Sequence, residues 1–208
     1  MLAAVDSAVA LGADLVEVDV RRRADGVAAV GHDLVDHDSP TLAHVIEHLG
    51  DRAALHLDLK EPDPHATIVA EAVGALGPDR VVVTTSEDAD VPAIRTWATG
   101  HAPGLLVGLS TSRRVVHGRW TGRAGARIAS WLPRTRMRRS GADLVVSHHL
   151  LARWWLARWA AKRGLPLLVW TVDEDTDLRR WLNDPRATIV TTNRPARALE
   201  LRGVAEGG

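Results

Sequence analysis

The stretch from residue 12 to residue 33, GADLVEVDVRRRADGVAAVGHD, most constrains how this chain can fold. It begins with alternating residue types, and because side chains alternate along a strand, this pattern predicts a β-strand over residues 15–20. Three valines share one face of that strand, and Glu17 and Asp19 share the other. A row of valines requires a hydrophobic layer, whereas two carboxylates require water, cations or a metal ion.

A hairpin follows this strand. The dipeptide Asp25-Gly26 is a strong turn signal, and residues 27–30 return as the second arm. The link is too short for a parallel crossover, which takes about a dozen residues or more. The hairpin therefore brings His32 back toward the end of the strand where the carboxylates lie. Two carboxylates and an imidazole are groups that suit metal-assisted hydrolysis.

Strands and helices alternate along the remaining chain. We expect helices over residues 2–11, 41–49 (with Ser39 as the cap), 67–76, 91–99, 150–163 and 177–182. Besides 15–20, we expect parallel strands over residues 55–60, 81–85, 105–109, 142–147, 167–171 and 188–191. This order predicts an α/β fold with seven parallel strands, one fewer than a closed (β/α)8 barrel. The interpretation is a TIM-type barrel that lacks its first strand, formed as a single domain over residues 1–208.

The strand predicted at residues 55–60, LHLDLK, repeats the strict alternation. Its leucines form one face, and His56, Asp58 and Lys60 form the other. Lysine is rare in this chain: 24 of the 26 basic residues are arginine, and the two lysines are Lys60 and Lys162. We therefore interpret Lys60 as a residue with a specific role.

Composition excludes several classes of protein. The chain of 208 residues has no cysteine, so disulfides and thiolate metal sites are excluded. Its formal net charge is zero, which favours neither nucleic acid nor an anionic membrane as a partner. No apolar run reaches the roughly 20 residues of a membrane span, and the acidic Asp6 argues against a signal peptide in the first residues. We expect a cytoplasmic protein without stable membrane insertion.

The stretch at 12–33 resembles the signature of the glycerophosphodiester phosphodiesterases, a family of TIM-barrel enzymes. LDLK at 57–60 and WTV at 170–172 are similar to two further motifs of that family. The resemblance implies hydrolysis of a small glycerophosphodiester to glycerol 3-phosphate and an alcohol. Members typically begin with a strand ending in His-Arg-Gly, which carries their first catalytic histidine. By that comparison the present sequence starts after this strand.

The resemblance also implies roles for individual residues. Glu17 and Asp19 match metal-binding residues, and Asp58 lies where the family usually has a third acidic ligand, Glu. Oxygen ligands favour a hard divalent cation, Ca²⁺ or Mg²⁺. Lys60 matches a lysine that would bring positive charge to a phosphate, and His32 matches the second catalytic histidine. Trp170 would line the substrate cleft.

Other interpretations stay open for these residues. Asp58 and Lys60 can form an ordinary ion pair, and Trp170 can simply pack at the barrel mouth. Ten arginines and no acidic residue occur over residues 91–142, and we expect a solvated face there rather than a nucleic-acid site. For the whole protein the alternatives are a non-catalytic remnant that binds phosphodiesters or phosphate, and a related barrel phospholipase.

Overall fold

The computed structural model describes residues 2–61, 65–110 and 131–206. The chain groups into two compact units, Met1–Gly108 and Leu109–Gly208, and each is described here by itself. The division leaves the expected single domain as a prediction. Five of the ten arginines over residues 91–142 fall within residues 111–130, which lie outside the described residues.

The first unit alternates strands and helices. Its strands are β1 (Leu15–Arg22), β2 (Ala28–Val30), β3 (Ala54–Leu59), β4 (Val81–Thr85) and β5 (Leu106–Ser110), the last of which extends across the unit boundary. Its helices are α1 (Leu2–Leu11), α2 (Leu42–Leu49), α3 (Ala66–Leu76), the short 3₁₀ turn η1 (Pro78–Arg80) and α4 (Asp90–His101). The hydrogen-bonded order of the strands is β2-β1-β3-β4-β5.

The hairpin is present as predicted. β2 pairs antiparallel with β1, with Val20 opposite Val30. Gly26 adopts a positive φ of 85°, a conformation that glycine reaches at little cost, and the turn carboxylate of Asp25 accepts a hydrogen bond from the backbone of Val27.

Parallel pairing of β1, β3 and β4 aligns polar side chains of the three strands in rows. Asp19 is paired with Asp58, which is paired in turn with Thr84. One step earlier, Glu17 is paired with His56. Paired residues of neighbouring strands point to the same face of a sheet, so these five side chains share one face.

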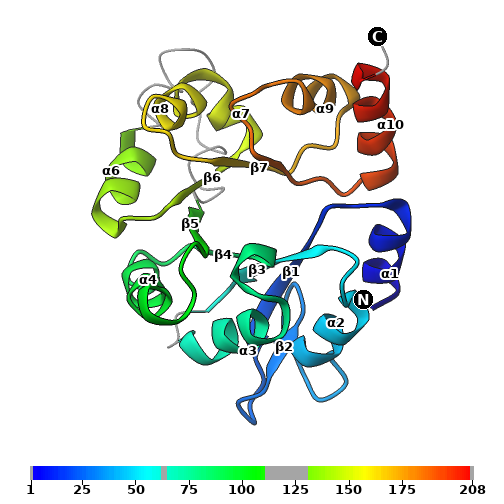
Figure 1. The fold of residues 1–208 in the computed structure, drawn as a ribbon, viewed down its shortest axis with the longest axis vertical. Helices are drawn as coiled ribbons and strands as arrows, with labels where there is room; N and C mark the ends of the chain where they lie inside the picture. Colours follow the sequence, from blue (N-terminus) through cyan, green and yellow to red (C-terminus); the bar gives the residue numbers. More distant parts are fainter. Residues whose placement is uncertain (1, 62–64, 111–130, 207–208) are drawn as a thin grey trace. The chain divides into compact units, whose positions relative to one another are not determined.

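The two faces of β1 differ as the alternation predicts. Val16, Val18 and Val20 are buried. Figure 1 shows the helices α1 to α4 beside the strands of the first unit.

One detail of the helix prediction is wrong. The residue that caps α2 is Thr41, whose side chain accepts a hydrogen bond from the backbone of His44. Ser39 is engaged instead in a turn with Asp36, because its hydroxyl reaches that carboxylate at 3.0 Å.

The second unit contains three further strands, β6 (Leu144–His148), β7 (Leu167–Trp170) and β8 (Ile189–Val190), and both neighbouring pairs are parallel. Its helices are α6 (Trp131–Ser140), α7 (His149–Leu151), α8 (Ala157–Ala161), α9 (Asp175–Leu182) and α10 (Pro195–Glu206). The sequence analysis did not predict α6 or α10. The helix predicted over residues 150–163 is interrupted by a π-helical segment, η3 (Ala152–Leu156), where the hydrogen-bonding step lengthens locally.

All seven predicted parallel strands are found among the described residues, with β2 as the additional hairpin arm. The α/β fold class is therefore confirmed. No helix in the described part of the chain is long and apolar enough to cross a membrane.

Candidate metal centre

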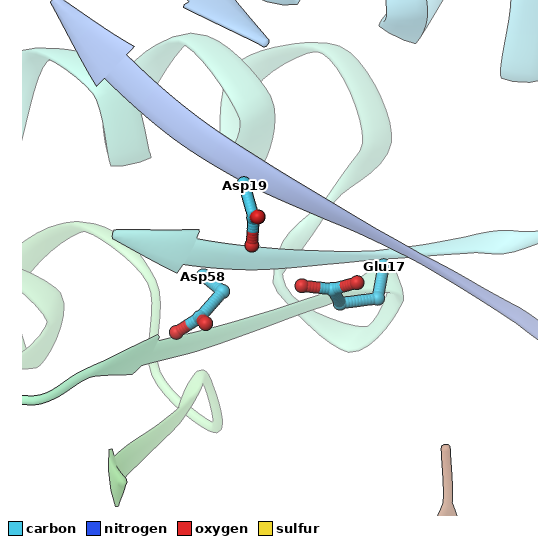
Figure 2. Close-up of side chains that lie close together, drawn as sticks. All are labelled: Glu17, Asp19 and Asp58. Carbon is cyan, nitrogen blue, oxygen red and sulfur yellow. The ribbon is translucent and has the colours of Figure 1, made fainter. Parts of the chain in front are cut away.

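Three carboxylates meet on the polar face of the first unit. Glu17 and Asp19 project from β1 and Asp58 from β3, and one oxygen of each lies within 4.8 Å of the others. Figure 2 shows the three side chains turned toward one another. Solvent reaches Glu17, whereas Asp19 and Asp58 are half-buried. The strand alternation and the β1–β3 register thus assemble the acidic set that the sequence predicts.

Lys60 lies directly against this set. Its Nζ is 2.7 Å from Oδ1 of Asp19 and also forms a close ion pair with Oδ2 of Asp58. Burial lowers the pKa of Lys60, but the charge of Asp58 and the bonds to both aspartates outweigh it, so the pKa is raised. The ion pair that the sequence left open as an alternative is therefore formed, and it extends to a second carboxylate.

The crowded surroundings of the cluster shift the pKa of Glu17. Although solvent reaches it, protein atoms around its carboxyl displace much of its hydration, and this desolvation contributes most to a pKa raised from 4.5 to about 8. The charge of Asp19, a hydrogen bond shared with Asp19 and the charge of Asp58 raise the pKa further, and Lys60 lowers it. A group of carboxylates that holds a proton near neutral pH is short of positive charge. A hard divalent cation with oxygen ligands fits these residues.

A hydrogen-bonded chain holds the third carboxylate from the neighbouring strand. The hydroxyl of Thr84 on β4 donates to Oδ1 of Asp58 at 2.7 Å, and Nε2 of His56 lies 2.8 Å from the same hydroxyl. His56 and Thr84 are buried, with 4% and 1% of their surface exposed. Burial lowers the pKa of His56 to about 4. His56 was predicted to lie on the polar face, without a role, and Thr84 was not predicted to lie at the site, since only the β3–β4 register shows that the two meet.

His32 lies on the loop after β2, with its side chain 84% exposed and its Nδ1 2.9 Å from Asp33. Arg21 anchors this loop by donating to the carbonyl of His32 at 3.1 Å and to Glu61 at 3.0 Å. Among the described contacts, none joins His32 to the three carboxylates. Its predicted role as an acid depends on a substrate and stays a prediction.

Known proteins were compared with this chain at the level of sequence and of structure. No family model matches the sequence. Likewise, no curated protein matches it.

Solved structures do match, over almost the whole chain. A glycerophosphodiester phosphodiesterase from Agrobacterium tumefaciens is 21% identical with a TM-score of 0.69, and the match covers 95% of this chain and 90% of that one. One from Parabacteroides distasonis is 17% identical with a TM-score of 0.73, covering 99% and 90%. An Oleispira antarctica phosphodiesterase, solved with its product sn-glycerol-3-phosphate, is 15% identical with a TM-score of 0.69, covering 96% and 89%. The chain has the fold of these phosphodiesterases.

That likeness establishes the fold. The predicted absence of a first barrel strand is not tested by coverage of this extent and stays a prediction.

Trp170 belongs to the second unit, at the end of β7. Its ring meets that of His148 edge-on at 5.5 Å between centroids. Its indole N–H is buried without a hydrogen-bond partner among the described residues. Packing of the ring, the simpler of the two interpretations, is thus observed, and contact with a substrate stays a prediction.

The same unit contains the sequence TNRP over residues 192–195, in which Asn193 contacts an aspartate. Oδ1 of Asp173 accepts hydrogen bonds from the backbone N–H of Asn193 at 2.8 Å and from the Thr192 hydroxyl at 3.0 Å. The Asn193 side-chain amide donates to Oδ2 at 2.9 Å. An aspartate at position 193 could not donate this last bond, because an ionised carboxylate only accepts.

Proposed function

We propose that this protein is a metal-dependent phosphodiesterase that hydrolyses glycerophosphodiesters to glycerol 3-phosphate and an alcohol. The observation that carries the proposal is the Glu17, Asp19 and Asp58 cluster on a fold shared with glycerophosphodiester phosphodiesterases. Further support comes from the Oleispira antarctica phosphodiesterase, which holds sn-glycerol-3-phosphate as its product.

In this proposal the three carboxylates hold Ca²⁺ or Mg²⁺, which when bound polarises the phosphoryl oxygens. Lys60 turns its ammonium from Asp19 and Asp58 toward the phosphate and stabilises the negative charge that develops there. Water forms the new bond to phosphorus, and the bond from phosphorus to the alcohol oxygen breaks. His32 donates a proton to the leaving alkoxide, and the proton released by the attacking water restores it. Contact of Trp170 with the substrate, as expected from the sequence, belongs to the same proposal.

The alternative is a remnant that binds phosphate or phosphodiesters without catalysis. Two observations favour it: Lys60 already forms ion pairs with two of the three carboxylates, and His32 is largely exposed.

An assay of glycerol 3-phosphate release separates the two. Glycerophosphocholine and glycerophosphoethanolamine are incubated with the 208-residue chain in Ca²⁺ or Mg²⁺, and again with excess chelator. The same assay is run on a form extended upstream by the codons that precede Met1. We expect release that chelator abolishes and that Glu17→Ala lowers by at least about 10²-fold, while Glu71→Ala, an exposed glutamate of α3, leaves it unchanged.

The outcomes are distinct. Metal binding without turnover in either form contradicts catalysis and leaves the remnant. Turnover of long-chain phospholipids in preference to these soluble diesters indicates the phospholipase instead. A cytoplasmic location and a small-molecule substrate as the partner belong to the same proposal.

A further inference from the structure

Asp58 of the candidate metal centre is hydrogen-bonded to Thr84, which is hydrogen-bonded in turn to His56, and neither Thr84 nor His56 has a part in the proposed chemistry. We propose that Thr84, backed by His56, is the positioning residue that fixes the carboxylate of Asp58 for cation binding. This inference rests on the proposed function only in that the carboxylate cluster binds a divalent cation.

The direction of each hydrogen bond follows from the number of protons available. A carboxylate only accepts, so the single proton of the Thr84 hydroxyl goes to Oδ1 of Asp58. The hydroxyl oxygen must then accept from His56, and Nε2 of that ring therefore carries a proton. The bond from His56 fixes the rotation of the hydroxyl and so points its proton toward Asp58. The chain acts as one unit whose far end is a buried imidazole.

Thr84 restrains one oxygen of Asp58 and leaves the other for the cluster. Oδ2 of Asp58 faces the side on which Lys60 bridges to Asp19. Rotation of the carboxylate would break the 2.7 Å bond to Thr84, whose own side chain is fully buried. A freely rotating aspartate would lose conformational entropy when it binds a cation, and this restraint removes much of that cost.

Restraint from β4 matters more for an aspartate than for a longer side chain. Asp58 has one methylene fewer than a glutamate would have at this position. Its carboxylate cannot compensate for a wrong rotation by flexing a longer stem, so the neighbouring strand must set its angle. The pairing of Asp58 with Thr84 places the hydroxyl directly beside the carboxylate.

The next residue of the same strand provides a matched control. Thr85 is also buried, but its hydroxyl donates to Asp90 at 3.2 Å and has no bond to Asp58. Thr84→Val and Thr85→Val each delete one buried hydroxyl from β4. Only the first touches the proposed positioning chain.

Calorimetric titration with Ca²⁺ and with Mg²⁺ tests the inference on the full chain. We expect Thr84→Val to weaken binding by about 10–100-fold, Thr84→Ser to stay within about threefold of the parent because it restores the hydroxyl, and Thr85→Val to match the parent. Thermal unfolding without metal is recorded for all four proteins. A purely structural role predicts equal losses of stability for the two valine variants and no difference in metal affinity.

Each result has one meaning. Equal affinity in Thr84→Val and Thr85→Val overturns the positioning role while leaving the metal centre intact. A parent protein that binds neither cation overturns both the metal centre and this inference. Should Thr84→Val fail to fold, His56→Leu probes the same chain from its far end: a several-fold weaker affinity supports the inference, and an unchanged one overturns it.

Discussion

Two carboxylate groups of this molecule have opposite electrostatics. In the first unit, burial and neighbouring charges raise the pKa of Glu17 to about 8. In the second, Asp173 and Asp175 both have lowered pKa values. For Asp173, burial raises the pKa, but the hydrogen bonds from Asn193 and Thr192 outweigh it; for Asp175, the bonds from Arg197 are the main cause.

The difference lies in the number of donors. Asp175 accepts from Arg197 at 2.9 Å and from Arg194 at 3.3 Å, so its charge is balanced within the protein. The first group has three carboxylates and a single ammonium, that of Lys60, in the described contacts. A balanced carboxylate joins structural elements, whereas an unbalanced cluster has capacity left for a cation. Acidic composition alone does not distinguish the two, and the donor count does.

The largest expected effect is that of Lys60→Met on the carboxylate cluster of the first unit. It removes the ammonium that competes for Asp19 and Asp58, so we expect Ca²⁺ affinity to rise by up to about tenfold. Hydrolysis should nevertheless fall by about 10²–10³-fold, because the charge that stabilises the phosphate is lost. Calorimetry and the glycerol 3-phosphate assay on the same preparation measure the two effects.

A higher cation affinity together with slower hydrolysis would show that Lys60 acts on the substrate and not on the cation. Lys60→Arg, which keeps the charge, is the control and should recover part of the rate. If Lys60→Met instead lowers cation affinity, the lysine supports the cluster and does not compete with the cation for it.

The polar faces that carry the acidic cluster could be predicted from the sequence because they depend on local rules. Alternation over residues 15–20 and 55–60 placed Glu17, Asp19 and Asp58 on such faces, whereas their meeting in one cluster was implied by the family resemblance and follows from the β1–β3 register. Periodicity of this kind survives in a single sequence because each strand must bury one face.

Features that depend on register or on loop conformation could not be predicted. Thr84 looks like one more residue of a buried β-branched strand until the β3–β4 register aligns it with Asp58. The exposure of His32 depends on how Arg21 and Glu61 hold the loop after β2. The capping role of Thr41 was assigned to Ser39, since both precede the helix and only the turn at Asp36 distinguishes them.

The raised pKa of Glu17 predicts that cation binding depends on pH. Glu17 holds its proton below about pH 8 in the folded chain, and a cation must displace it. Affinity should therefore rise by about tenfold per pH unit up to that point and then level off. Calorimetry near pH 7 in two buffers of different ionisation enthalpy should detect release of about one proton.

Glu17→Gln is the control for this proton, and in it the buffer dependence should disappear. The sign for folding is the reverse of that for binding. Without metal, the folded state retains a proton that the unfolded chain releases above its pKa of 4.5, so this group lowers stability as pH rises from there toward 8. Cation binding without proton release would show that Glu17 is not a ligand.

The smallest expected effect concerns the balanced group. Asp173→Ala removes the acceptor for Asn193 and Thr192, and we expect a loss of about 1 kcal/mol of unfolding free energy at pH 7, moderated by solvent. Because the folded pKa of Asp173 is lowered, its contribution is present above the unfolded pKa and is lost as pH falls through the folded one. The difference between parent and variant in urea unfolding should therefore vanish in acid, while Ca²⁺ affinity at pH 7 stays unchanged. A variant that instead loses Ca²⁺ binding would show that the two carboxylate groups are coupled, and the distinction between a structural and a cation-binding cluster would fail.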